Sequence, residues 1–176
     1  MQKQQIIDAL RNNHELFISY LAQLNNQDFV AERNEKWTAA QQLEHIIRSV
    51  KPLNQGLMLP AFMLKLFFGK ANRPSKNYDE LVAKYNRKLT EGGKATAAFI
   101  PPKITTSKKE RLLRELNNRA GKLCRQVNGF SEAQLDNIIT PHPLLGKVTL
   151  REMLYFTAYH VLHHKALIEK NLLPAG

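Results

Sequence analysis

Histidines are the residues of this sequence best suited to chemistry, and two of them have a spacing that brings side chains together on a helix. His160 and His164 lie four residues apart near the C-terminus. On a helix, this spacing puts two side chains on one face, about one turn apart. Two imidazole nitrogens can then converge on a divalent cation such as zinc. The alternative is that the rings bond to neighbouring polar groups or to each other, because an unpaired imidazole is costly to bury.

The segment around these histidines predicts a helix that faces a protein core. Apolar and small side chains recur there at helical spacing and share one face with both histidines. They are Leu150, Met153, Leu154, Thr157, Val161, Leu167 and Ile168. We therefore expect His160 and His164 to project into a helical bundle, with His163 at the edge of the same face.

Periodicity predicts four long helices along the chain. Three of them begin at a capping box, in which two side chains satisfy backbone N–H groups at the first turn. These boxes start at Thr38, Ser107 and Thr149. The expected ranges are residues 3–24, 38–53, 107–128 and 149–172.

The chain between the second and third long helices predicts smaller elements. Short helices are expected over residues 61–68 and 77–89, followed by a glycine- and proline-containing loop over residues 90–106. No stretch alternates clearly as a strand does, and residues 141–146 are expected to be a linker. The prediction is an all-α four-helix bundle with extra short helices between the second and third long helices, in one domain over residues 1–176.

Three segments resemble the DinB family of four-helix bundles. They are the stretch from Trp37 through the helix cap to His45, the P-x-x-G stretch at residues 143–152, and the H-x-x-H-H motif that ends at His164. The resemblance implies a divalent metal, with zinc or nickel favoured, held by His45, His160 and His164. Three ligands leave coordination positions open, as catalytic sites do.

Two residues depart from a simple version of this interpretation. His45 points away from the apolar face formed by Leu43 and Ile46, so the metal site requires the polar face of its helix to line an internal cleft. Leu167 stands where family members often carry glutamine. That departure favours a non-catalytic member.

The other histidines and the single cysteine are expected to have structural roles. His14 shares a face with Leu10 and Phe17 and is expected in the core, whereas His142 lies between two prolines and is expected at the surface. Cys124 is expected to be a small core residue, and a single cysteine excludes an internal disulfide.

Charge and hydropathy limit the classes of partner. The formal net charge is +11, but the basic residues form no long tract, which predicts a solvated basic surface and no specific nucleic-acid partner. The longest apolar run, residues 57–68, is shorter than the roughly 20 residues that span a bilayer. Residues 58–68 of this run are expected to pack on the bundle, with a homodimer interface and then a membrane surface as alternatives. With no signal-peptide pattern, a cytoplasmic location is expected.

The resemblance leaves two functions open. The first is a metal-dependent hydrolase or low-molecular-weight-thiol transferase that acts on a small molecule, anionic or thiol-containing. The sequence names no general base for it. The second is a non-catalytic binding or stress-response module with a structural or vestigial metal site.

Overall fold

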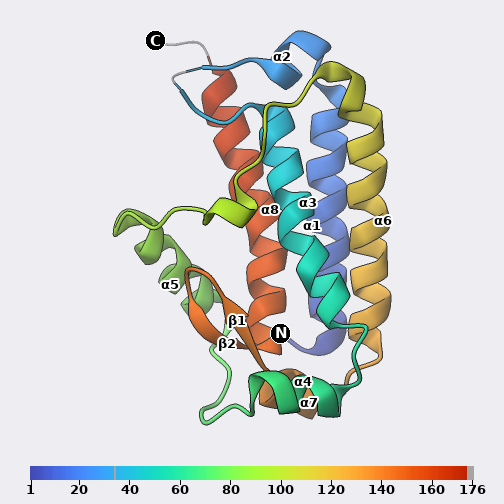
Figure 1. The fold of residues 1–176 in the computed structure, drawn as a ribbon, viewed down its shortest axis with the longest axis vertical. Helices are drawn as coiled ribbons and strands as arrows, with labels where there is room; N and C mark the ends of the chain where they lie inside the picture. Colours follow the sequence, from blue (N-terminus) through green and yellow to red (C-terminus); the bar gives the residue numbers. More distant parts are fainter. Residues whose placement is uncertain (34, 174–176) are drawn as a thin grey trace.

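Four long helices form the bundle in the computed structural model, which describes residues 1–33 and 35–173 (Figure 1). They are α1 (Lys3–Gln23), α3 (Ala39–Gly56), α6 (Lys109–Asn128) and α8 (Leu150–Leu172). Helices α1 and α3 each contact both α6 and α8. Helices α1 and α8 run in one direction, and α3 and α6 in the other (Figure 1). The predicted four-helix bundle is confirmed.

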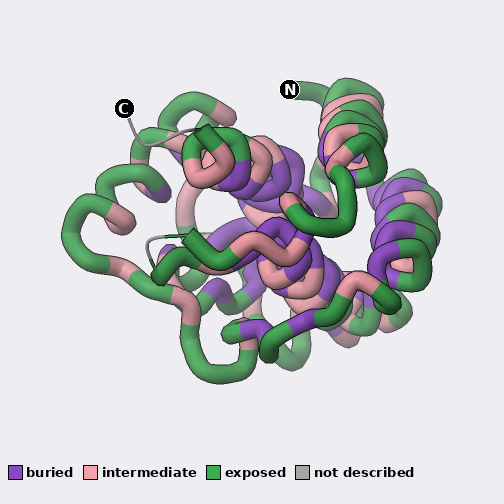
Figure 2. The backbone as a smooth tube through the Cα atoms, turned by 90° about the horizontal axis from the view of Figure 1, so that it is seen from above, coloured by how far each residue is buried: buried purple, intermediate pink, exposed green. Residues whose placement is uncertain are grey.

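The apolar faces of the four helices meet in a common core. Figure 2 shows buried residues along the inner sides of the long helices and exposed residues along the outer sides. Each helix contributes side chains with almost no exposure, among them Phe17, Leu43, Leu116 and Leu154. Burial of such side chains is the main favourable contribution to folding.

Two of the three predicted capping boxes form, and the third does not. At α3, the backbone N–H of Gln41 donates to the Thr38 hydroxyl and the Thr38 N–H donates back to the Gln41 side chain, at 3.1 and 3.0 Å. The box at Thr149 forms in the same way. The box predicted at Ser107 is wrong, because a 3₁₀ turn, η2 (Thr106–Lys108), precedes α6 and the Ser107 hydroxyl pairs with Thr105.

The connection from α3 to α6 contains the predicted short helices. They are α4 (Ala61–Phe68) and α5 (Tyr78–Thr90), and a 3₁₀ turn, η1 (Ala97–Phe99), lies within the predicted loop. Helix α5 packs on α8, and η1 packs on α3. The other short helices are α7 (Glu132–Asn137) and α2 (Asn26–Val30), of which α2 was not predicted.

A small β-hairpin replaces the predicted linker. Strands β1 (Ile139–His142) and β2 (Gly146–Thr149) pair antiparallel, with Thr140 opposite Val148. Gly146 has a φ of +76°, which glycine adopts at little cost. The hairpin packs on α8. Four-residue strands are too short for the sequence to show a clear alternation.

Helix α4 lies at one end of the bundle (Figure 1). Most of its apolar side chains are exposed. Leu64 is buried, but Phe62, Leu66 and Phe67 are 70%, 78% and 60% exposed. The expectation that this run packs on the bundle therefore holds for Leu59, Ala61 and Leu64 and is wrong for these three exposed side chains. None of the described helices is long and apolar enough to cross a membrane.

Candidate metal centre

The structure brings His45, His160 and His164 together, and we call these residues the three-histidine cluster. His45 lies on α3, and the other two lie one turn apart on α8. The Nε2 atom of His160 is 2.9 Å from that of His164 and 3.3 Å from that of His45. All three rings are buried, and one nitrogen from each lies within 4.8 Å of the other two.

The outer nitrogens of two rings are held by oxygen acceptors. The Nδ1 atom of His45 lies 2.8 Å from the backbone carbonyl oxygen of Phe99. A carbonyl oxygen only accepts, so this Nδ1 carries the hydrogen and the Nε2 of the neutral ring has a free lone pair. His164 Nδ1 pairs in the same way with the side-chain oxygen of Gln42. Metal-binding histidines typically use their second nitrogen like this.

The spacing of the Nε2 atoms fits a cation. Lone pairs this close repel one another unless a proton or a cation lies among them. Nitrogens bound tetrahedrally at about 2.1 Å from zinc lie about 3.4 Å apart. The observed separation of 3.3 Å is close to this value, and the other, 2.9 Å, is shorter by about half an ångström. The three-histidine cluster could therefore hold a metal ion.

Burial keeps these rings in the form that binds metal. It lowers the pKa of His160 and His164 well below the ordinary value, and the neighbouring histidines lower it further. The pKa of His45 is also lowered by burial, despite its bond to the Phe99 carbonyl. Neutral imidazole is the protonation state that ligates a cation.

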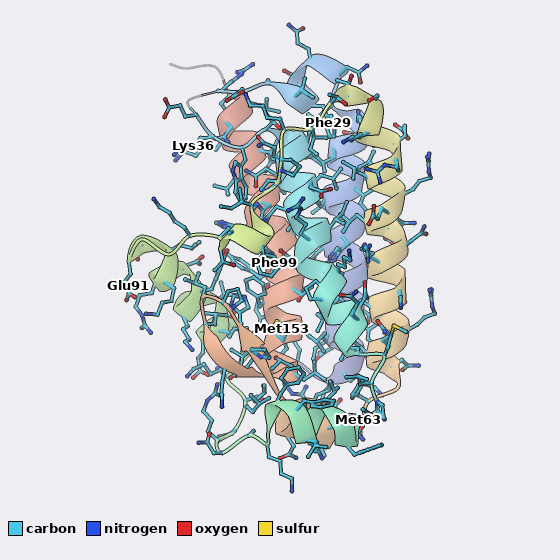
Figure 3. The ribbon with its side chains drawn as sticks, viewed as in Figure 1. Phe29, Lys36, Met63, Glu91, Phe99 and Met153 are labelled. Carbon is cyan, nitrogen blue, oxygen red and sulfur yellow. The ribbon has the colours of Figure 1, made fainter. Side chains whose placement is uncertain are left out.

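His45 is buried because other segments cover the polar face of α3. The Trp37 ring packs on its ring, with centroids 5.0 Å apart, and η1 places Phe99 against its outer nitrogen. Figure 3 shows Phe99 beside α3 and α8. Gln42 on the same polar face is buried too. The internal cleft that the sequence required is present.

The cluster lies on the wall of an open cavity of about 370 Å³, here called the α3–α8 cavity. Its other walls come from α5, the hairpin and the segment before η1, and they are mostly apolar. The polar side chains in the lining include Tyr85, Lys94 and Thr96. A ligand in this cavity can reach the cluster.

His142 differs from its predicted surface position. It is 9% exposed and lines the α3–α8 cavity, because the hairpin folds it inward. Its Nδ1 accepts the backbone N–H groups of Leu144 and Leu145 at 3.1 and 3.0 Å. Burial lowers its pKa to about 4. The two flanking prolines did not indicate this inward position.

The other histidines are placed as expected. His163 is partly buried and lines the same cavity beside the cluster. His14 lies in the core outside the cluster, with Nδ1 2.7 Å from the Leu10 carbonyl oxygen. Cys124 is buried between α1 and α6.

A comparison with protein families matches residues 9–168 to the DinB superfamily, a range that contains all three clustered histidines. The chain belongs to the DinB superfamily. A search of the curated proteins finds no match. Leu167, where DinB-like sequences were expected to carry glutamine, is partly buried on α8 just beyond His164.

Proposed function

We propose that this DinB-superfamily protein is a metal-dependent enzyme, either a hydrolase or a low-molecular-weight-thiol transferase. His45, His160 and His164 would hold a divalent cation, with zinc and nickel the favoured ions. The observation that supports this most is that three buried Nε2 atoms converge on the wall of an open cavity. Three ligands from the chain leave positions for water or substrate.

The residues around the cluster have separate tasks in this proposal. A bound cation would supply Lewis-acid activation of water, or would hold a thiolate nucleophile. The Phe99 carbonyl and the Gln42 side chain fix the tautomers of His45 and His164. The apolar walls exclude water and so strengthen electrostatic interactions inside the cavity. Lys94 adds a positive charge suited to an anionic substrate.

Turnover by chelator-stripped and reconstituted protein tests this function. The ester probe is p-nitrophenyl acetate, and the thiol probe is monochlorobimane with cysteine, glutathione or coenzyme A. We expect zinc or nickel to restore turnover of one probe class in the wild type and in His14→Leu, a buried histidine outside the cluster. His160→Ala should stay inactive. Equal turnover with and without metal would contradict the proposal.

One observation favours a non-catalytic binding module as the second candidate. No carboxylate side chain lines the α3–α8 cavity in the described part of the chain, so the cavity offers no acidic general base. A binding module would take up the same metal and would turn over neither probe.

A further inference from the structure

The α3–α8 cavity extends along two helices. Along α3 its lining runs from His45 to Gly56, and along α8 from Met153 to His164. Each of these stretches of helix rises about 16 Å. Since α3 and α8 are antiparallel neighbours, the two walls face each other over this length. A cavity of about 370 Å³ drawn out to this length suits a chain-like molecule better than a compact one.

The two ends of the cavity differ in chemistry. The three-histidine cluster and Phe99 form one end. The other end is formed by Leu57, Leu64 and Phe68, from the end of α3 and from α4. Figure 3 places Phe99 beside the middle of α8, with Met153 below it and Met63 of α4 at the bottom of the molecule.

The apolar end continues onto the surface of the protein. Phe68 lines the cavity and is also 38% exposed, next to the exposed Phe67 and Leu66. Exposed apolar surface of this kind is uncommon on soluble proteins and often marks a binding site. An apolar ligand chain would cover Phe68 from the cavity side.

We infer that the α3–α8 cavity binds an elongated amphiphile, an acyl or alkyl chain with a metal-coordinating anionic or thiol head. The head lies at the three-histidine cluster, and the tail follows α3 past Val50 and Leu53 toward Leu64 of α4. The position of the head rests on the proposed metal site. The position of the tail rests on the shape and lining of the cavity alone.

Calorimetric titration with saturated fatty acids tests the tail site. The probes are butanoate, hexanoate, octanoate, decanoate and dodecanoate, each below its micelle-forming concentration and added to zinc-loaded protein. Burial of each added methylene should tighten binding about fourfold until the cavity is full. Affinity that does not depend on chain length would overturn the inference.

Gly56 provides a substitution that shortens the cavity. It lines the apolar end, and a Cβ atom built on it meets nothing within 4 Å. Gly56→Ala and Gly56→Leu should therefore fold, because either residue favours a helix more than glycine does. We expect the affinity plateau to move to shorter acids, more for leucine than for alanine, with butanoate binding unchanged.

Gly121→Leu is the matched control, since Gly121 is a helical glycine of α6 that lines a different pocket. It should reproduce the wild-type chain-length series. A plateau at the same acid in wild type and Gly56→Leu would contradict the tail site.

His160→Ala separates the tail site from the metal site. It should weaken every acid by a similar factor while the dependence on chain length persists. If the protein binds no metal, wild type and His160→Ala will bind each acid equally, and the chain-length series still decides the tail site. A flat series in metal-loaded protein rejects the tail site and leaves the metal site standing.

Discussion

Gln42 and Phe99 hold the outer nitrogens of two clustered histidines, although neither residue is itself a candidate ligand. Gln42 sits one turn before Ile46 on α3 and is almost fully buried. A buried amide aimed at an imidazole fixes which nitrogen carries the hydrogen. The affinity of the site for metal should therefore depend on this side chain.

Gln42→Leu removes the acceptor of His164 and keeps the volume similar. We expect zinc affinity to fall about 10- to 100-fold, the usual effect of losing such a partner. Competition with a fluorescent chelator measures it. Ser49→Ala is the control, because the Ser49 hydroxyl donates to the His45 backbone carbonyl and contacts no ring nitrogen. An affinity unchanged in Gln42→Leu would show that this hydrogen bond does not hold the ligand.

His14 predicts a pH dependence of folding that is separate from the metal site. Burial lowers its pKa to about 4, and its Nε2 is buried with no hydrogen-bond partner among the described residues. As the pH falls below the ordinary pKa near 6.5, the unfolded chain takes up this proton before the folded chain does. The native state therefore loses stability between about pH 6.5 and 4, by up to about 3 kcal/mol from this residue.

Urea unfolding of metal-free wild type and His14→Leu at pH 7 and pH 4.5 measures this contribution. The other buried histidines titrate in both proteins, so their effects cancel in the difference. The variant should lose less stability on acidification by about 2–3 kcal/mol. If both proteins lose the same stability between pH 7 and pH 4.5, the folded protein protonates His14 as readily as the unfolded chain does.

An ion pair between the partly exposed Arg73 and the buried carboxylate of Glu152 joins the α4–α5 connection to the start of α8. Both Arg73 Nη atoms donate to the Glu152 carboxylate, at 2.6 and 2.8 Å, and the Lys76 N–H donates to it at 2.7 Å. Burial raises the pKa of Glu152, but these bonds outweigh it and hold the pKa below its usual value. The same carboxylate caps α8 through the Thr149 N–H.

Arg73→Met should destabilise the fold by about 2–3 kcal/mol, because it leaves a buried carboxylate short of a partner. Chemical denaturation checks this. Arg87→Met is the matched control, since Arg87 pairs with Glu91 at the exposed surface, where solvent screens the ion pair, and its loss should change stability far less. Similar losses in both variants would contradict the special role of Glu152.

The sequence predicted the four long helices and the short helices α4 and α5, but it did not predict α2 or the hairpin. The four long helices carry enough turns for periodicity to show, and the boxes at Thr38 and Thr149 mark two of their starts. The hairpin has too few residues for such a signal. The Ser107 motif matched a capping box by composition, but the chain enters α6 through a 3₁₀ turn that leaves Ser107 outside the cap position.

Helical periodicity predicted part of the candidate site and missed the rest. His160 and His164 share the apolar face of α8, so periodicity alone placed them inward. The position of His45 needed the family resemblance, because the segments that cover it, Trp37 and η1, approach from other parts of the chain. His142 was missed because its burial depends on how the hairpin packs on α8.

For the whole molecule, a cation in the three-histidine cluster would link α3 to α8 across the bundle. A ligand that binds only the folded state stabilises it, by about 4 kcal/mol at a free concentration a thousandfold above Kd. Zinc should therefore raise the Tm of the wild type in a concentration-dependent way. His160→Ala should show no such rise, and a rise equal to that of the wild type would place the zinc elsewhere.

Two features of the molecular surface concern possible partners: its net charge and its exposed apolar residues. The net charge of +11 is spread over the chain, and the homodimer considered for the apolar run stays a prediction. Helix α4 is the surface on which such an association would form, because its phenylalanines are exposed. The dependence of sedimentation on concentration, in wild type and Phe67→Lys, measures it.

The proposed function requires that His45, His160 and His164 together bind one divalent metal ion. The most direct test is metal content by inductively coupled plasma mass spectrometry, on untagged protein purified without chelator. We predict about one zinc or nickel ion per chain in wild type and in His14→Leu, and little in His45→Ala or His160→Ala. A wild-type protein that carries no metal and takes up neither added zinc nor added nickel would contradict the account.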